Sequence, residues 1–129
     1  MIIGVGVDAV DIERIDRLVQ EYGERFLRRV YTEKEIEYAF LSTAKLHERL
    51  AGRFAVKEAV LKVLGTGKSG GILWKDVETL RGPGGKPRVM LHGKAKEHAD
   101  NLGISAVHVS ISHDGKMALS FVIAEGEIK

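Results

Sequence analysis

The segment from Arg53 to Gly65 constrains the fold of this chain more than any other part of the sequence. At 3.6 residues per turn it predicts a helix that is apolar over most of its surface. The apolar sector contains Ala55, Val56, Ala59, Val60 and Val63. Arg53 and Lys57 lie one turn apart on one side, and a second charged pair, Glu58 and Lys62, lies on another. Such a helix belongs inside the molecule rather than on its surface.

Glu58 is the unusual residue of this helix. Phe54 and Leu61 lie between the two charged pairs, so Glu58 does not lie on an ordinary solvated face. A carboxylate in such surroundings must be paired, protonated or bound to a metal, because burying it alone is too costly. One interpretation is an (i, i+4) ion pair with Lys62, worth about 0.2–0.5 kcal/mol. The other interpretation is that Glu58 belongs to a functional site, and the sequence near the two ends of the chain favours it.

The composition predicts one domain that spans residues 1–129. A chain of 129 residues can bury one core but not two. Hydrophobic residues make up 44% and charged residues 29%, which is typical of a soluble globular protein. The chain has no cysteine, which excludes disulfides, thiolate metal sites and cysteine nucleophiles. We find neither a signal peptide nor an apolar run of about 20 residues, and therefore expect a cytoplasmic protein with no membrane partner.

Turn and capping signals divide the chain into elements. Helices are predicted at 11–22, 24–30, 32–41, 44–65 and 93–102, and strands at 2–10, 73–80, 88–91, 107–112 and 117–124. Thr32 and Glu35 form a capping box, and Asp114-Gly115 marks a hairpin. The strand at 2–10 is apolar enough to be buried on both faces. Because helices cluster early and strands late, we predict an α+β fold with a largely antiparallel sheet packed on a long central helix.

Asp8 places a charge in the otherwise apolar first strand. By strand alternation it faces the same side as Gly4 and Gly6, which leave room for a close approach. A structural interpretation is that Asp8 caps a helix or pairs with an arginine. Together with Glu58, however, it offers two hard oxygen ligands that suit Mg²⁺ or Mn²⁺ completed by waters and substrate phosphates. Lys62, one turn after Glu58, would then neutralise phosphate charge in the same place.

Two other motifs resemble catalytic sequences but lack the necessary geometry. The run from His108 to Asp114 contains Ser, His and Asp, yet neighbours in a strand point to opposite faces and no strand-to-helix elbow surrounds either serine. His108, Ser110 and Ser112 fit the polar face of an edge strand, and His113 lies at the turn, where it can reach into a cleft. The glycine-rich segment 66–71 is not a phosphate-binding P-loop, because no strand precedes it.

Arginines are concentrated in the first two predicted helices. They are Arg14, Arg17, Arg25, Arg28 and Arg29, and acidic neighbours partly offset their charge. This surface is either simply solvated or a docking face for an acidic protein. We expect no nucleic-acid partner, because the net charge is only +2 and no aromatic stacking platform accompanies the arginines.

Three segments together resemble the bacterial holo-acyl-carrier-protein synthases, a group of 4′-phosphopantetheinyl transferases. The first is Gly4-Val5-Gly6-Val7-Asp8 with Ile12-Glu13-Arg14-Ile15. The second runs from Gly52 to Ala59 and continues through Lys62 and Gly65-Thr66-Gly67. The third runs from His108 to His113, and Gly85-Lys86-Pro87 matches a recurrent hairpin. The resemblance covers about residues 1–124, and the order and spacing of the motifs make it specific.

The resemblance implies that 4′-phosphopantetheine is transferred from coenzyme A to a serine of apo acyl carrier protein, with release of adenosine 3′,5′-bisphosphate, in support of fatty acid biosynthesis. It implies that Asp8 and Glu58 bind Mg²⁺ and that Glu58, Lys62 and His113 are catalytic. The implied coenzyme A-binding residues are Arg53, Lys62, Gly65, Thr66 and His113. The implied contacts with the acyl carrier protein are Arg14, Arg17, Arg25 and Arg28, because carrier proteins are acidic.

The resemblance also implies the assembly. Larger monomeric relatives carry another acid two residues after the first Asp, where this chain has Val10. We therefore expect the small subtype, a homotrimer with active sites between subunits. The base that accepts the serine proton is Glu58 acting through a water, or a carboxylate of the carrier protein. Two other functions fit the residues: a binding module for an acidic partner, and a metal-dependent pyrophosphate hydrolase.

Overall fold

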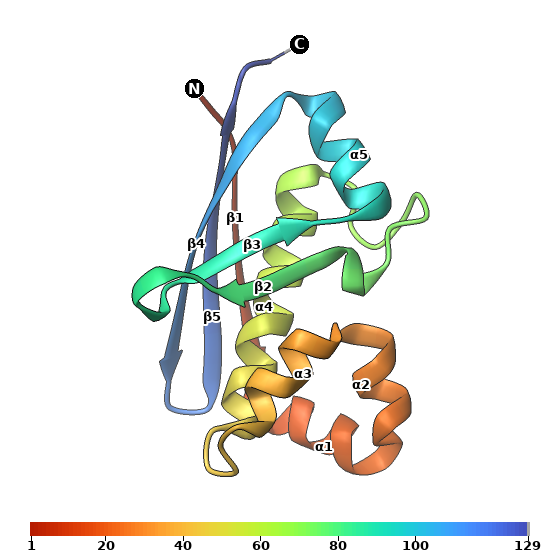
Figure 1. Cartoon of the computed structure of the whole chain (residues 1–129), viewed down its shortest axis with the longest axis vertical. Helices are drawn as coiled ribbons and strands as arrows, with labels where there is room; N and C mark the ends of the chain where they lie inside the picture. The colour runs from red at the N-terminus through yellow and green to blue at the C-terminus, as the bar shows by residue number, and fades with distance from the viewer. Residues whose placement is uncertain (129) are drawn as a thin grey trace.

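The computed structural model describes residues 1–128 and has the predicted α+β architecture (Figure 1). Its strands are β1 (Ile2–Asp11), β2 (Val77–Arg81), β3 (Pro87–Leu91), β4 (Ile104–Asp114) and β5 (Met117–Gly126). Its α-helices are α1 (Ile12–Tyr22), α2 (Glu24–Val30), α3 (Glu33–Phe40), α4 (Leu46–Leu64) and α5 (Gly93–Leu102). Two short 3₁₀ helices, η1 (Trp74–Asp76) and η2 (Pro83–Gly85), flank β2.

The strands form two antiparallel sheets on different sides of α4 (Figure 1). The larger sheet has the order β1-β5-β4, so β1 and β4 are its two edges. The smaller sheet is the β2-β3 hairpin. Helices α1, α2 and α3 cluster around the first half of α4, whereas α5 lies near its second half (Figure 1). The long helix is therefore central, as predicted.

Glycine in β1 lets the large sheet approach α4 closely. A Cβ on Gly6 would collide with the backbone carbonyl of Ala59, and one on Gly4 would lie 3.1 Å from the side chain of Val63. The open space that these glycines predict next to Asp8 is thus filled by α4 itself. This close approach places the side chain of Asp8 next to α4.

One prediction about β1 is wrong for the single chain. Its inner face packs on α4, but Val5 and Val7 on the outer face are each 53% exposed. Phe121, which lies opposite Val7 on β5, is 47% exposed. The apolar residues of this strand predict burial on both faces, and within one chain nothing among residues 1–128 covers the outer one.

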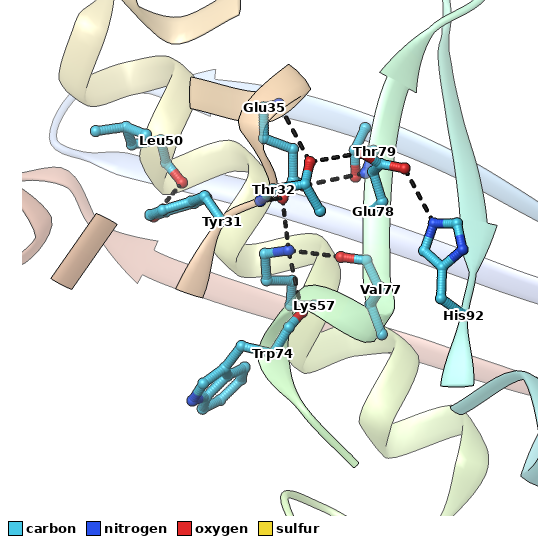
Figure 2. Close-up of polar contacts among 10 residues, drawn as sticks. All are labelled: Tyr31, Thr32, Glu35, Leu50, Lys57, Trp74, Val77, Glu78, Thr79 and His92. Carbon is cyan, nitrogen blue, oxygen red and sulfur yellow. Dashed lines mark hydrogen bonds and ion pairs between the residues drawn. The ribbon is translucent and has the colours of Figure 1, made fainter. Parts of the chain in front are cut away.

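A buried ion pair joins α4 to the small sheet and to α3 (Figure 2). The Nζ atom of Lys57 donates to Glu35 Oε1 at 2.8 Å and to the carbonyls of Trp74 and Val77. Both side chains of the pair are fully buried. Burial lowers the pKa of Lys57, and the charge of Glu35 opposes this effect. The Glu35 carboxylate thereby favours the charged form of the ammonium, which burial disfavours.

Glu35 also carries out the capping role that the sequence predicts. Its Oε1 accepts from the backbone N–H of Thr32, whose hydroxyl accepts from the backbone N–H of Glu35. Its other oxygen, Oε2, accepts from the backbone N–H of Thr79 on β2. One buried carboxylate therefore caps α3, binds Lys57 and anchors β2, so its hydrogen-bonding capacity is well used.

The network continues to the surface through Thr32 and Glu78 (Figure 2). The Thr32 hydroxyl donates to Glu78 Oε2 at 2.5 Å, and His92 Nε2 lies 3.0 Å from Glu78 Oε1. Burial acts to raise the pKa of Glu78, but the hydrogen bonds from Thr32 and His92 outweigh it, and this pKa is lowered. Glu78 is therefore ionised at neutral pH.

Two element boundaries differ from the prediction by more than two residues. The strand predicted at 73–80 begins as the 3₁₀ helix η1, because the Asp76 carboxylate accepts from the backbone N–H of Leu73 and closes a turn. The strand predicted at 107–112 begins earlier, at Ile104, where it pairs with Gly126. Local hydrogen bonding and strand pairing thus determine where these elements begin, which the pattern of apolar residues alone does not predict.

The ion pair gives a stability prediction. We expect Lys57→Met to lower the free energy of unfolding by roughly 3–5 kcal/mol, because it leaves the Glu35 carboxylate buried without its cation. The matched control is Lys96→Met on α5, which removes a lysine from an exposed pair with Asp100 and should cost less than about 1 kcal/mol. Urea denaturation measures both. Equal costs for the two variants would contradict this role of the buried pair.

Candidate functional site

Asp8, Glu58 and Lys62 come together where β1 crosses α4. The Nζ atom of Lys62 donates to Asp8 Oδ1 at 2.8 Å and to the carbonyl of Val7 at 3.0 Å. Within residues 1–128, Lys62 forms its ion pair with Asp8 rather than with Glu58. The interpretation of Glu58 and Lys62 as an ordinary (i, i+4) pair is therefore wrong.

The pKa of Glu58 departs from that of an ordinary glutamate. Its pKa is raised, first by burial and then by the negative charge of Asp8, whereas Arg14 and Lys62 oppose the shift. The pKa of Lys62 is raised, mainly by its hydrogen bond to Asp8. Two carboxylates from distant parts of the chain are thus held close enough to repel each other, with Lys62 and Arg14 as neighbouring cations.

A cleft of about 470 Å³ opens beside these residues. Its lining consists of Glu58, Leu61, Lys62, Gly65, Gly67, Lys68 and Trp74. This volume falls within the range of small-molecule sites, about 300–1,000 Å³. Of the predicted coenzyme-binding residues, Lys62 and Gly65 line the cleft. Thr66 instead lines a smaller hollow toward α5, and its hydroxyl donates to the carbonyl of Gly67.

The structure does not bring His113 to this cleft within one chain. Asp8 lies opposite Ser120 on β5, and Ser120 lies opposite Ile111 on β4, so His113 is on the far edge of the sheet. Two strand spacings separate the edges by roughly 10 Å. His113 Nε2 lies 3.1 Å from the carbonyl of Glu48, near the beginning of α4.

Arg53 is also remote from the cleft. It precedes Glu58 by five residues, which is about 140° around a helix of 3.6 residues per turn. Its guanidinium lies 4.1 Å from the ring centroid of Tyr38, which Arg49 and Arg81 also approach, at 4.3 and 5.3 Å. Burial lowers the pKa of Arg53, and among the described residues its Nε has no hydrogen-bond partner. Three cations around one ring form an arginine cluster suited to an anion.

The four predicted carrier-protein contacts are all exposed but are not equivalent. Arg28 pairs with Glu24 at 2.9 Å and with Glu33 at 3.1 Å, so its charge is already balanced. Arg14 lies over the ring of Phe54 and is close enough to Glu58 to affect its pKa. The structure thus connects Arg14 to the site itself.

Sequence reasoning missed several residues that contribute to these surfaces. Trp74 and Lys68 line the cleft, and the ammonium of Lys68 lies 5.7 Å from the centroid of the Trp74 ring. Arg49 and Arg81 complete the arginine cluster. Arg49 lies one turn before Arg53 on the same helix, and this spacing by itself predicts that the two side chains are neighbours. The position of Arg81 depends on the β2-β3 hairpin, which no local pattern places beside α3.

The donor atoms of Asp8 and Glu58 fit Mg²⁺. Both are hard carboxylate oxygens, and the repulsion that raises the pKa of Glu58 is what a divalent cation between them would relieve. Residues 1–128 contain no group of three or more His, Asp or Glu that could hold a metal by themselves. The two carboxylates would therefore need water and substrate phosphates as further ligands, which is common for Mg²⁺.

No helix within residues 1–128 is both long and apolar enough to cross a membrane.

The comparisons with known proteins agree with one another. Residues 4–121 match the family described as the 4′-phosphopantetheinyl transferase superfamily. A holo-[acyl-carrier-protein] synthase from Koribacter versatilis (strain Ellin345) is 47% identical over 125 residues, which cover 97% of this chain and 99% of that protein.

Solved structures of holo-[acyl-carrier-protein] synthases share the fold of this chain. The holo-[acyl-carrier-protein] synthase of Neisseria meningitidis superposes with a TM-score of 0.87 at 34% identity, over 97% of this chain and 99% of that one. The enzyme from Bacillus anthracis strain Ames, solved in complex with coenzyme A (3′,5′-ADP), has a TM-score of 0.80 at 34% identity, over 98% and 99% of the two chains.

The environment of Glu58 gives a prediction about pH. We expect Arg14→Gln to raise the pKa of Glu58 further, because the Arg14 charge lowers it. Arg17→Gln, one turn along the same helix, is the matched control and should leave it unchanged. Carbon-13 NMR titration of the side-chain carboxyl groups in metal-free protein measures both.

The raised pKa of Glu58 also has a consequence for activity. If catalysis needs ionised Glu58, activity falls on acidification at a higher pH than for an ordinary glutamate, and Arg14→Gln moves this fall to a still higher pH. An Arg14→Gln protein with an unchanged titration of Glu58 would show that Arg14 does not act on this carboxylate.

Proposed function

The chain belongs to the 4′-phosphopantetheinyl transferase superfamily, and from this we propose that Asp8, Glu58 and Lys62 catalyse transfer of 4′-phosphopantetheine from coenzyme A to a serine of apo acyl carrier protein. Adenosine 3′,5′-bisphosphate is the second product. The observation that carries the proposal is that these three residues meet beside a cleft large enough for part of a coenzyme. As a single domain, the chain would supply holo carrier protein for fatty acid biosynthesis.

The chemistry is a phosphoryl transfer. The serine oxygen attacks the phosphorus that bears pantetheine, the bond from that phosphorus to the bridging oxygen breaks, and the adenosine bisphosphate leaves with the bond electrons. Mg²⁺ (or Mn²⁺), held by Asp8 and Glu58, would neutralise charge on the pyrophosphate. Lys62 is exposed enough to turn from Asp8 toward a phosphate oxygen and stabilise the leaving group.

The proton of the attacking serine needs an acceptor. Glu58 is the first candidate, because its raised pKa makes it a better base at neutral pH than an ordinary carboxylate. It is half-buried at the edge of the cleft and can act through one intervening water. A carboxylate of the carrier protein is the alternative, since the attacking serine belongs to that partner.

We further propose that the active species is a homotrimer with sites between subunits. His113 and Arg53 lie away from Glu58 within one chain, so they join a coenzyme site only if they come from a neighbouring subunit. The outer face of the large sheet is the surface that neighbours would cover, because it exposes Val5, Val7 and Phe121 side by side. Val10 is 2% exposed in the core and offers no third carboxylate, as in the small subtype.

In such an assembly the arginine cluster of Arg49, Arg53 and Arg81 would bind a phosphate of the coenzyme held by the adjacent subunit. The unpartnered Nε of buried Arg53 supports this role, because a buried donor without an acceptor is costly. His113 would approach the same phosphates, while Gly65 and Thr66 would line the path of the coenzyme at the end of α4.

The carrier protein would dock on the arginines of α1 and α2. Arg14, Arg17 and Arg25 are exposed, and Arg14 lies near the catalytic carboxylates. Arg28 would contribute less, because Glu24 and Glu33 already balance its charge. Attraction to an acidic partner acts mainly on the association rate. Because coenzyme A and carrier proteins are cytoplasmic, we place the protein in the cytoplasm.

The reaction is tested by incubating the protein with coenzyme A and Mg²⁺, with and without apo carrier protein. We expect mass spectrometry to show phosphopantetheine added to the carrier, and no activity in EDTA. Asp8→Ala and Glu58→Ala should each lower the rate by about 100-fold or more while the circular dichroism spectrum is retained. Asp100→Ala, which removes an exposed acid on α5, is the control and should be fully active.

The other two functions give different results in this experiment. A pyrophosphate hydrolase would release adenosine 3′,5′-bisphosphate without a carrier protein. A binding module would leave coenzyme A intact and would be insensitive to Asp8→Ala.

The assembly is tested on the outer face of the sheet. Phe121→Arg should convert the trimer to a monomer and remove most of the activity, because a charge replaces an apolar contact between subunits. Tyr22→Arg is a matched control, since Tyr22 is also 47% exposed but lies at the end of α1. Light scattering gives the mass of each species. A wild-type monomer with full specific activity would refute the trimer.

A further inference from the structure

Ser120 is a buried hydroxyl without a partner in the part of the chain that the structure describes. It lies on β5, is 2% exposed, and its Oγ has no hydrogen bond within residues 1–128. Its side chain points to the inner face of the large sheet, as do its buried neighbours Ala118 and Val122. Buried polar groups in proteins are nearly always hydrogen-bonded, so this hydroxyl needs an acceptor.

The residue directly across the sheet from Ser120 is Asp8. Strand alternation puts both side chains on the face that packs against α4, and that of Asp8 is 12% exposed. Directly opposed residues of an antiparallel pair have Cβ atoms about 4.5–5.5 Å apart, within reach of a hydrogen bond between the two side chains.

Asp8 has an acceptor to spare. Its Oδ1 binds Lys62, and no hydrogen bond from any of the described residues reaches its Oδ2. The serine hydroxyl needs only a rotation about χ1 or its C–O bond to donate, because serine moves between staggered rotamers at little cost. A hydroxyl and a carboxylate oxygen without partners therefore lie on facing positions of one buried surface.

We propose that Ser120 is a positioning residue that donates a hydrogen bond to the Asp8 carboxylate and fixes its orientation toward Glu58. The bond would become most important when Lys62 turns toward a phosphate and leaves Asp8 without its cation. This inference rests on the proposed function, because Asp8 is there a ligand of the divalent cation. Hydrogen bonds to ligating carboxylates typically change metal affinity 10–100-fold.

The hydrogen bond itself is tested without metal, by a double-mutant cycle in EDTA. Urea midpoints are measured for wild type, Ser120→Ala, Asp8→Ala and the double variant. We expect Ser120→Ala to lower the midpoint in the wild-type background and to have no such effect once Asp8 is alanine. Thr79→Val is the matched control, because Thr79 also has a buried hydroxyl without a partner within residues 1–128 and lies on β2, away from Asp8. Its effect should be equal in both backgrounds. An equal effect of Ser120→Ala in both backgrounds overturns the proposal.

The positioning role is tested by Mn²⁺ binding to the protein saturated with coenzyme A, whose phosphates supply the further ligands. Electron paramagnetic resonance measures the free ion. We expect Ser120→Ala to weaken Mn²⁺ binding by about tenfold and Thr79→Val to leave it unchanged. Equal affinities of wild type and Ser120→Ala would overturn the role even if the hydrogen bond exists. A wild-type protein that binds no more Mn²⁺ than coenzyme A alone would instead remove the cation site of the proposed function, and the positioning role with it.

Discussion

The buried ion pair between Lys57 and Glu35 is the interaction on which the other parts of this structure depend. It joins α4, α3 and β2 through one ammonium and one carboxylate whose remaining hydrogen bonds are satisfied (Figure 2). It also fixes the rotation of α4 about its axis. Because Lys57 is held toward α3 and the small sheet, the next residue, Glu58, lies about 100° further around the helix and faces the cleft. The carboxylate proposed to be catalytic is thus oriented by its immediate neighbour in the sequence.

Much of the fold follows from local patterns. The capping box at Thr32 and the hairpin after β4 both lie where the sequence places them. The role of Lys57 could not be predicted, because its partner is 22 residues away and the helix pattern only pairs it with Arg53. Charges on a helix indicate a solvated edge unless tertiary partners are known. Here the edge with Arg53 and Lys57 is buried.

The residues of the candidate site also divide into those that local patterns place correctly and those that they do not. Asp8, Glu58 and Lys62 follow from strand alternation and helix spacing, and one chain brings them together. His113 and Arg53 carry the right chemistry in the right motifs, yet in one chain they lie at the far edge of the sheet and on another side of α4. A motif specifies residue types and spacing but not which copy of the chain supplies each residue. The apolar outer face of β1 is a second example of what a sequence pattern leaves open. The apolar residues predict that the strand is buried, but they do not say what covers it.

The fold brings two like charges together at a cost that other interactions must offset. Gly6 lets β1 approach α4 so closely that Asp8 raises the pKa of Glu58. Relative to an ordinary glutamate, Glu58 therefore destabilises the folded state above its own raised pKa, and this penalty disappears as the pH falls below the pKa of the unfolded chain. The Lys57–Glu35 pair, about 100° around α4 from Glu58, prevents the helix from rotating or shifting to separate the two carboxylates. Repulsion that a free helix would relax is thereby retained, and a divalent cation bound between the two carboxylates would relieve it.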